Sequence, residues 1–429
     1  MGEPDSPLLI AITEDPGTAE AAEATQARDR LRGALDMYAP GGRADDAWFG
    51  GLPDMGARGF AIALAVLNGL PFEQIVRAAH HLGGPEPFEV NRRDLLRMLG
   101  ARTREKTEPG EFGPTPVEVI EYLERDRPRA VLDEVWHQYQ FQRPLLDWLR
   151  GLATDPSLDV RIHAGTALGV LSTYAFDFVH SHALRSLADD DNPWSWDVLA
   201  YALRVPARDD RLFPLVRQLA NRLQRDAGQP RAQAAAARVQ GLALGPVAAE
   251  ESLDRLDRLA VVDDWRVAWG IGAGLADLLV DDSERHAPDV LRRVAQWQAD
   301  PRRTIAAQYA FLYLARNVRS QAWPGLLLLA DRLPALRPVL IACWVRVLNS
   351  GAMEPAVAAA LNGWAELAES YGEVRLSFVR LLKAVAATGP RSRAIVLRHA
   401  ATWVWPDTQF PLPETAAAVT EALTVRTDG

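Results

Sequence analysis

Apolar residues recur at intervals of three and four along most of the chain, which is the period of amphipathic helices. Residues 60–67 are apolar on every side, as expected of a fully buried helix. Pro71 begins the next helix, whose apolar face extends to Leu82. Further helices are predicted over residues 18–38, 92–99 and 130–139, and short strands over residues 8–13 and 117–122. The pattern therefore predicts a mostly all-α fold.

Clusters of Gly and Pro divide the chain into four predicted segments. Residues 1–50 form an N-terminal segment with one helix. Residues 51–140 contain three short helices followed by a turn-rich stretch with strand character, which predicts a winged-helix-like domain. Residues 141–410 read as successive helix–turn–helix pairs, and residues 411–429 as a C-terminal tail helix.

An internal recurrence indicates repeats in the long helical segment. The sequence VLRRVAQW at residues 290–297 returns as VLRHAATW at residues 396–403, an offset of 106 that we interpret as three steps of about 35 residues. Acidic clusters recur with half that spacing, since Asp191 precedes Asp209 by 18 residues and Asp263 precedes Asp281 by the same interval. We therefore predict a HEAT-like α-solenoid of about seven helix pairs between Leu145 and Trp405.

The charge balance disfavours nucleic acid as the main partner. The chain has 47 basic and 56 acidic residues, a net charge of −9. All basic residues except Lys106 and Lys383 are arginine, which together with the many alanines is typical of a GC-rich genome such as that of an actinobacterium. Cys343 is the only cysteine, and no run of 18 apolar residues occurs. We expect a cytoplasmic protein with no membrane segment, and a buried Cys343.

Several segments resemble actinobacterial STAND-type NTPases. Residues 59–71, GFAIALAVLNGLP, resemble the first winged-helix segment of those proteins. Residues 131–136, VLDEVW, and residues 145–149, LLDWL, resemble the junction into their C-terminal helical repeats. The phosphate-binding Gly-x-x-x-x-Gly-Lys-Ser/Thr loop of the family does not occur in this sequence. The resemblance therefore implies a sensory or regulatory half without the ATPase domain, and it transfers no catalytic residue.

Local motifs give no support for catalysis, a cofactor or a metal. Residues 130–134 match the end of a Walker B strand but lie in a helical pattern. Residues 270–274, GIGAG, resemble a dinucleotide loop, yet they also lie in a helical repeat, so we expect these glycines to permit close helix packing. His180 and His182 would point about 200° apart on a helix, which disfavours a metal site with nearby His163. We expect no enzyme activity.

Two groups of residues are candidates for contact with a protein partner. Two tryptophans follow Asn192 and Pro193 in a predicted loop, where exposed rings would anchor a partner, although packing onto the next repeat is the alternative. The acidic clusters would line one edge of the repeats and receive a basic or peptide-like partner, or else cap helices. The candidate residues are Trp194, Trp196, Asp190, Asp209, Asp263 and Asp281.

A basic segment supports the alternative function. Its basic residues are Arg92, Arg93, Arg97, Arg102, Arg104 and Lys106. In a helix-turn-helix protein this segment would be the recognition helix, whereas in the STAND resemblance the unit packs internally. Our leading hypothesis is a non-catalytic protein-interaction scaffold in a bacterial signalling or defence-type assembly. The alternative is a transcription-linked DNA binder that uses the Arg92–Lys106 helix with Arg92, Arg93 and Arg97. The acidic total disfavours a third reading, a HEAT-like DNA glycosylase.

Overall fold

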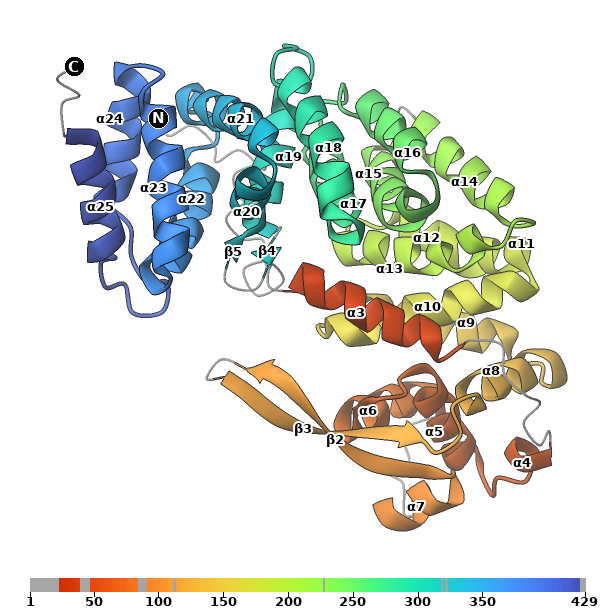
Figure 1. The fold of residues 1–429 in the computed structure, drawn as a ribbon. Coiled ribbons are helices and arrows are strands. Elements are labelled where there is room, and N and C mark those ends of the chain that lie inside the picture. Colours follow the sequence, from red (N-terminus) through yellow and green to blue (C-terminus); the bar gives the residue numbers. More distant parts are fainter. Residues whose placement is uncertain are drawn as a thin grey trace, which may run out of the picture. The chain divides into compact units, whose positions relative to one another are not determined.

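The computed structural model describes residues 23–38, 47–83, 91–110, 113–226, 228–317, 319–320 and 323–424. The described chain divides into two compact units. The first consists of residues 29–223, and the second consists of residues 224–424 together with residues 23–28. Helices make up most of both units, so the predicted mostly all-α class is confirmed (Figure 1).

The first unit combines helices with one small sheet. Its helices are α3 (Glu23–Asp36), α4 (Ala47–Gly50), α5 (Met55–Val66), α6 (Phe72–Gly83), α7 (Arg92–Met98), α8 (Arg127–Gln138), α9 (Gln142–Gly151), α10 (Leu158–Tyr174), α11 (Phe176–Val179), α12 (Arg185–Asp189), α13 (Pro193–Arg204) and α14 (Phe213–Arg225). The unit's boundaries fall inside α3, after residue 28, and inside α14, after residue 223. A π-helical turn, His180–Leu184, joins α11 to α12. The helices predicted near residues 60–67, 72–82, 92–99 and 130–139 are confirmed as α5, α6, α7 and α8.

The sheet of the first unit has three antiparallel strands in the order β1–β3–β2. The strands are β1 (Leu70–Pro71), β2 (Ala101–Gly110) and β3 (Gly113–Tyr122), and β2 and β3 form the long hairpin of Figure 1. The prediction of a single basic helix from Arg92 to Lys106 is wrong. Gly100, at φ 63°, ends α7 in the left-handed region, and residues 101–106 then pair with β3.

Most of helix α5 is buried, because its residues from Gly59 to Val66 are apolar on every side. Three side chains from other parts of the unit donate hydrogen bonds to its backbone carbonyls. The Tyr38 hydroxyl donates to Ala65, the Tyr122 hydroxyl to Ala61, and His163 Nδ1 to Val66. These bonds satisfy polar groups that burial would otherwise leave unpaired.

Helices α10 and α13 pack closely because α10 carries glycines at the contact. A Cβ added to Gly165 would lie 2.7 Å from the Cβ of Tyr201, and one added to Gly169 would overlap the carbonyl oxygen of Ala202. The two helices begin at Leu158 and Pro193, 35 residues apart.

The second unit is built from eleven further described helices with short connections. They are α15 (Pro230–Arg238), α16 (Gly245–Leu259), α17 (Trp265–Asp281), α18 (Ser283–Trp297), α19 (Thr304–Asn317), α20 (Gly325–Arg332), α21 (Arg337–Ser350), α22 (Glu354–Ser370), α23 (Gly372–Ala386), α24 (Pro390–Ala400) and α25 (Pro413–Thr424). A π-helical segment, Val239–Leu244, continues α15, and the strands β4 (Arg319–Ser320) and β5 (Trp323–Pro324) form a two-residue ladder.

Helices α15, α17 and α19 form a row whose contacts depend on small residues. A Cβ added to Gly270 would lie 2.7 Å from the carbonyl oxygen of Ala234 on α15. One added to Gly272 would lie 2.8 Å from the Cβ of Tyr313 on α19. The prediction that the glycines of residues 270–274 permit close helix packing is therefore confirmed. They lie within α17 rather than in a loop.

The 106-residue recurrence has a different origin from the one predicted. Helix α18 contacts α21, and α21 contacts α24, so these helices form one row. Their buried residues Val290, Cys343 and Val396 follow one another at intervals of 53 residues. The recurrence thus spans two steps of 53 rather than three of about 35. Each step contains three helices: α18, α19 and α20 in one, and α21, α22 and α23 in the next. Helices α19, α22 and α25 contact one another in turn and form a second row.

The remaining terminal predictions have mixed outcomes. The strand predicted at residues 8–13 lies outside the described residues. The helix predicted over residues 18–38 is described from Glu23 to Asp36, and α25 lies in the predicted tail.

Within the described ranges, no helix combines the length and apolar content needed to cross a bilayer.

Candidate functional site

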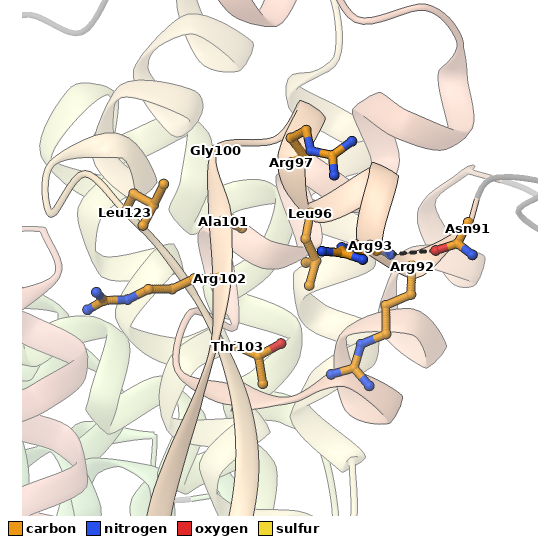
Figure 2. Close-up of a pocket in the computed structure, with 10 residues that line it drawn as sticks. All are labelled: Asn91, Arg92, Arg93, Leu96, Arg97, Gly100, Ala101, Arg102, Thr103 and Leu123. Carbon is orange, nitrogen blue, oxygen red and sulfur yellow. Dashed lines mark hydrogen bonds between the residues drawn. The ribbon is translucent and has the colours of Figure 1, made fainter.

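An open hollow of about 590 Å³ lies beside α7 and the start of β2 in the first unit. We call it the α7–β2 hollow. It is lined by Asn91, Arg92, Arg93, Leu96, Arg97, Gly100, Ala101, Arg102, Thr103 and Leu123. Figure 2 shows that α7 supplies one set of these side chains, β2 another, and the residue after β3 the last. Four of the lining residues are arginines, and none is acidic.

The local sequence fixes which α7 side chains face outward. Asn91 caps the helix, since its Oδ1 accepts a hydrogen bond of 2.8 Å from the backbone N–H of Arg93. Leu95 and Leu96 are buried, which leaves Arg93 and Arg97 on the exposed face of the helix. The short helical turn therefore places two guanidinium groups one turn apart at the hollow.

Three of the four arginines make intramolecular ion pairs. Arg92 pairs with Glu118 of β3 and stacks over Phe72, with its Cζ 4.5 Å from the ring centroid. Arg97 pairs with Asp94 at 3.0 Å, and Arg102 pairs with Glu121 at 2.6 Å.

Two of these pairs hold their arginines weakly. Asp94, Glu118 and Arg97 are exposed, so the Arg97–Asp94 and Arg92–Glu118 pairs each contribute about 0–1 kcal/mol to stability. A ligand carboxylate can therefore exchange with Asp94 or Glu118 at little cost, whereas Glu121 is largely covered and holds Arg102 with two hydrogen bonds.

Arg93 differs from its neighbours. Its backbone N–H donates a hydrogen bond to the Oδ1 of Asn91. Its exposed guanidinium, in contrast, makes no ion pair or hydrogen bond with the described part of the chain. No described residue therefore occupies the five N–H donors of this guanidinium.

Apolar side chains form the rest of the hollow. Leu123, directly after β3, is 61% exposed, whereas Leu96 and Ala101 are buried. The hollow thus combines apolar surface from Leu96, Ala101 and Leu123 with arginines around it. Sequence reasoning missed Leu123 and Thr103, because only the return of β3 along β2 brings residue 123 close to α7.

The two tryptophans predicted in an exposed loop belong to α13 instead. Trp196 is fully buried, and its Nε1 donates a hydrogen bond of 2.9 Å to the carbonyl oxygen of Asp190. Trp194 is half-buried, and the guanidinium of Arg161 covers its ring at 4.3 Å. Asn192 caps the helix by accepting a hydrogen bond from the Trp194 N–H, so the predicted loop is the first turn of α13. Trp196 therefore presents no surface to a partner, and neither ring lies in an exposed loop.

Two of the acidic candidates, Asp190 and Asp209, form hydrogen bonds with residues close to them in sequence. Asp190 accepts a hydrogen bond from the Ser195 hydroxyl, and hydrogen bonds from Arg211 lower the pKa of Asp209 to about 2. Asp263 is exposed beside Asp264, which caps α17. The side chain of Asp281 lies outside the described residues. The capping alternative is therefore confirmed for Asp264 and for Asp282, which caps α18.

Several other titratable side chains are held in contacts within their own unit. Among the described residues, no group of His, Cys, Asp and Glu is arranged to hold a metal ion. His182 stacks on Phe178 at 4.1 Å, whereas His163 is buried against α5. In the second unit the buried Arg238 pairs with Asp277 at 2.5 Å. Cys343 is buried as predicted, and burial raises the pKa of its thiol to about 12.

No model of a known protein family matches the chain, and a search of curated proteins gave no match. The function must therefore be argued from the described residues themselves.

Proposed function

We propose that this chain is a non-catalytic protein-interaction module, in which HEAT-like helical repeats are joined to a winged-helix-like domain. The observation that carries the proposal is the stacking of helices at fixed steps, with Val290, Cys343 and Val396 in equivalent buried positions. Such stacked helices present long, regular surfaces that bind extended partners.

The order of elements in the first unit supports the winged-helix-like part. Helix α5 is followed by β1, then by α6 and α7, and finally by the β2–β3 hairpin, with the sheet order β1–β3–β2. In this arrangement α7 occupies the place of a recognition helix, and the hairpin that of a wing.

The arginine pairing favours a protein partner over the DNA-binding alternative. Arg92, Arg97 and Arg102 already pair with carboxylates of the same unit. Duplex DNA carries one charge per about 1.7 Å, and would approach Asp94, Glu118 and Glu121 together with the arginines. The net charge of −9 adds a long-range repulsion.

The biological setting of the proposal rests on the sequence. The resemblance of residues 59–71 to STAND-type NTPases supports a regulatory or sensory role in a bacterial signalling or defence-type assembly. The single buried Cys343 supports a reducing, cytoplasmic setting.

Affinity capture of the tagged full chain from the source cells tests the proposal. One preparation is treated with nuclease and a second is left untreated, and both are washed at low and at high salt. We expect a stoichiometric protein partner that survives nuclease. Recovery of nucleic acid that is lost at high salt, with no protein remaining after nuclease, would support the DNA-binding alternative instead.

A further inference from the structure

We propose that the α7–β2 hollow binds an acidic peptide segment of a protein partner, with an aliphatic or aromatic side chain in the hollow and flanking carboxylates on the surrounding arginines. This inference rests on the proposed function and names the chemistry of one partner segment. It is carried by the joint presence of a hollow, exposed apolar surface and arginines in one place (Figure 2).

The charge of the lining selects an acidic ligand. Arg92, Arg93, Arg97 and Arg102 line the hollow, while the carboxylates that pair with three of them do not. Among the described residues no group forms an ion pair with the Arg93 guanidinium, so a ligand carboxylate there need not displace one of them. Arginine presents a planar fork of donors that matches a carboxylate in two parallel hydrogen bonds.

The apolar surface selects a peptide that also carries a hydrophobic side chain. Leu123 leaves 61% of its surface in solvent, beside the buried Leu96. Covering this surface with a Leu, Phe or Trp side chain removes apolar area from water, which is the main favourable term in most protein association. A central apolar anchor with polar contacts at its rim is also the usual anatomy of a binding hot spot.

The same features disfavour a nucleic acid in this hollow. A duplex offers sugars and regularly spaced phosphates, which can neither fill an apolar recess nor avoid Asp94 and Glu118 next to the arginines. A peptide places its few carboxylates only where the guanidinium groups lie.

The test uses the full chain and defined peptide pools. The acidic pool consists of fluorescent heptapeptides with Leu, Ile, Phe or Trp in the centre and Asp or Glu at every flanking position. A neutral pool replaces the acids by Asn and Gln, and a third acidic pool has Ser in the centre. A short random DNA duplex is measured alongside, all by fluorescence anisotropy.

Five variants at four positions are compared with the wild type, and one of them, Arg93→Lys, keeps the positive charge of Arg93. Arg93→Ala removes the guanidinium that has no partner among the described residues, and Leu123→Ser removes the exposed apolar side chain. Their matched controls are Arg143→Ala, which removes an exposed arginine of α9, and Met55→Ser, which removes a methionine that is 57% exposed at the start of α5. All four substituted residues have exposed side chains, so the fold should persist in every variant. Circular dichroism verifies it.

We expect saturable binding of the acidic pool with an apolar centre only. Arg93→Ala should weaken it roughly tenfold, as for the loss of one charge-assisted hydrogen bond, and Arg93→Lys less. Leu123→Ser should weaken it by a similar factor, while both controls bind as the wild type does. Equal binding of the neutral pool, no binding of the acidic pool, or preferential binding of the duplex would each overturn the proposal.

Failure of this proposal can be told apart from failure of the proposed function. If the protein partner captured from cells binds the Arg93→Ala and Leu123→Ser variants as well as the wild type, the hollow is not the site and the interaction module stands. If no protein is captured by any of them, the proposed function itself fails.

Discussion

Gly241 and Gly274 face each other across the contact between the π-helical segment after α15 and the helix α17. A Cβ on Gly241 would overlap the backbone of Gly274, and a Cβ on Gly274 would lie 2.8 Å from the carbonyl oxygen of Ala237. The two backbones approach so closely that neither position has room for a side chain. Because backbone atoms cannot move aside as the end of a side chain can, the row of helices would have to separate to admit a methyl group.

Gly241→Ala should therefore destabilise the second unit. Overpacking of a rigid contact costs about 1–3 kcal/mol or more, and here it exceeds the gain of up to about 1 kcal/mol in helix propensity. Urea denaturation followed by circular dichroism measures the change. Gly372→Ala is the control, since the nearest atom to a Cβ there is the flexible Arg375 Nη2 at 4.0 Å. Equal midpoints for the two variants would contradict the prediction.

Two buried tryptophans of the second unit should respond differently to phenylalanine. Trp297 Nε1 donates a hydrogen bond of 2.6 Å to Asp257, whereas Trp344 Nε1 is buried with no partner in the described chain. Both variants lose similar packing, but only Trp297→Phe also loses a hydrogen bond to a charged group. Its loss of unfolding free energy should exceed that of Trp344→Phe by about 1.5 kcal/mol. An equal or larger loss in Trp344→Phe would refute this assignment.

His163 should make the first unit sensitive to mild acid. Burial lowers the pKa of His163 below its ordinary value of 6.5, and Lys106 lowers it further, although the Val66 carbonyl and Asp159 act in the opposite direction. The unfolded chain therefore binds a proton that the folded chain resists. Stability from this residue is fully present above pH 6.5 and is lost as the pH falls below that value.

The variant His163→Asn isolates this effect, because an amide N–H can still donate to the Val66 carbonyl while the titrating ring is removed. We expect its unfolding midpoint to fall less than that of the wild type between pH 7 and about 5, where most carboxylates remain ionised. The exposed His81→Asn serves as the control and should follow the wild type. A variant that follows the wild-type acid response would exclude His163 as its source.

Cys343 should report unfolding of the second unit. Burial raises its thiol pKa to about 12, so at pH 7.5 the reactive thiolate is scarce and the sulfur is inaccessible. We expect negligible maleimide labelling of the native chain, and complete labelling in urea above the unfolding midpoint. Rapid labelling of the native chain, measured by mass spectrometry, would show that the helix α21 opens locally.

The sequence by itself determined the helices and much of what they bury. The apolar run of residues 60–67 has no polar face to present to water, so a central helix was predictable from it. Cys343 and the glycines of residues 270–274 were also assigned correctly, because their neighbours in sequence are apolar and helical in period. Local physics decides these features, since side-chain periodicity and glycine content act within one or two turns.

The tertiary structure alone decided which segments meet. Sequence likeness between residues 290–297 and 396–403 could not reveal that α21 stacks between them, because steps of 35 and of 53 both divide 106 almost evenly. Trp196 follows an Asn-Pro turn signal, yet it is fully buried in the packed unit. Leu123 becomes part of a hollow with Arg93 only because β3 returns along β2. Contacts between residues distant in sequence depend on how helices and strands pack, and no local pattern encodes that choice.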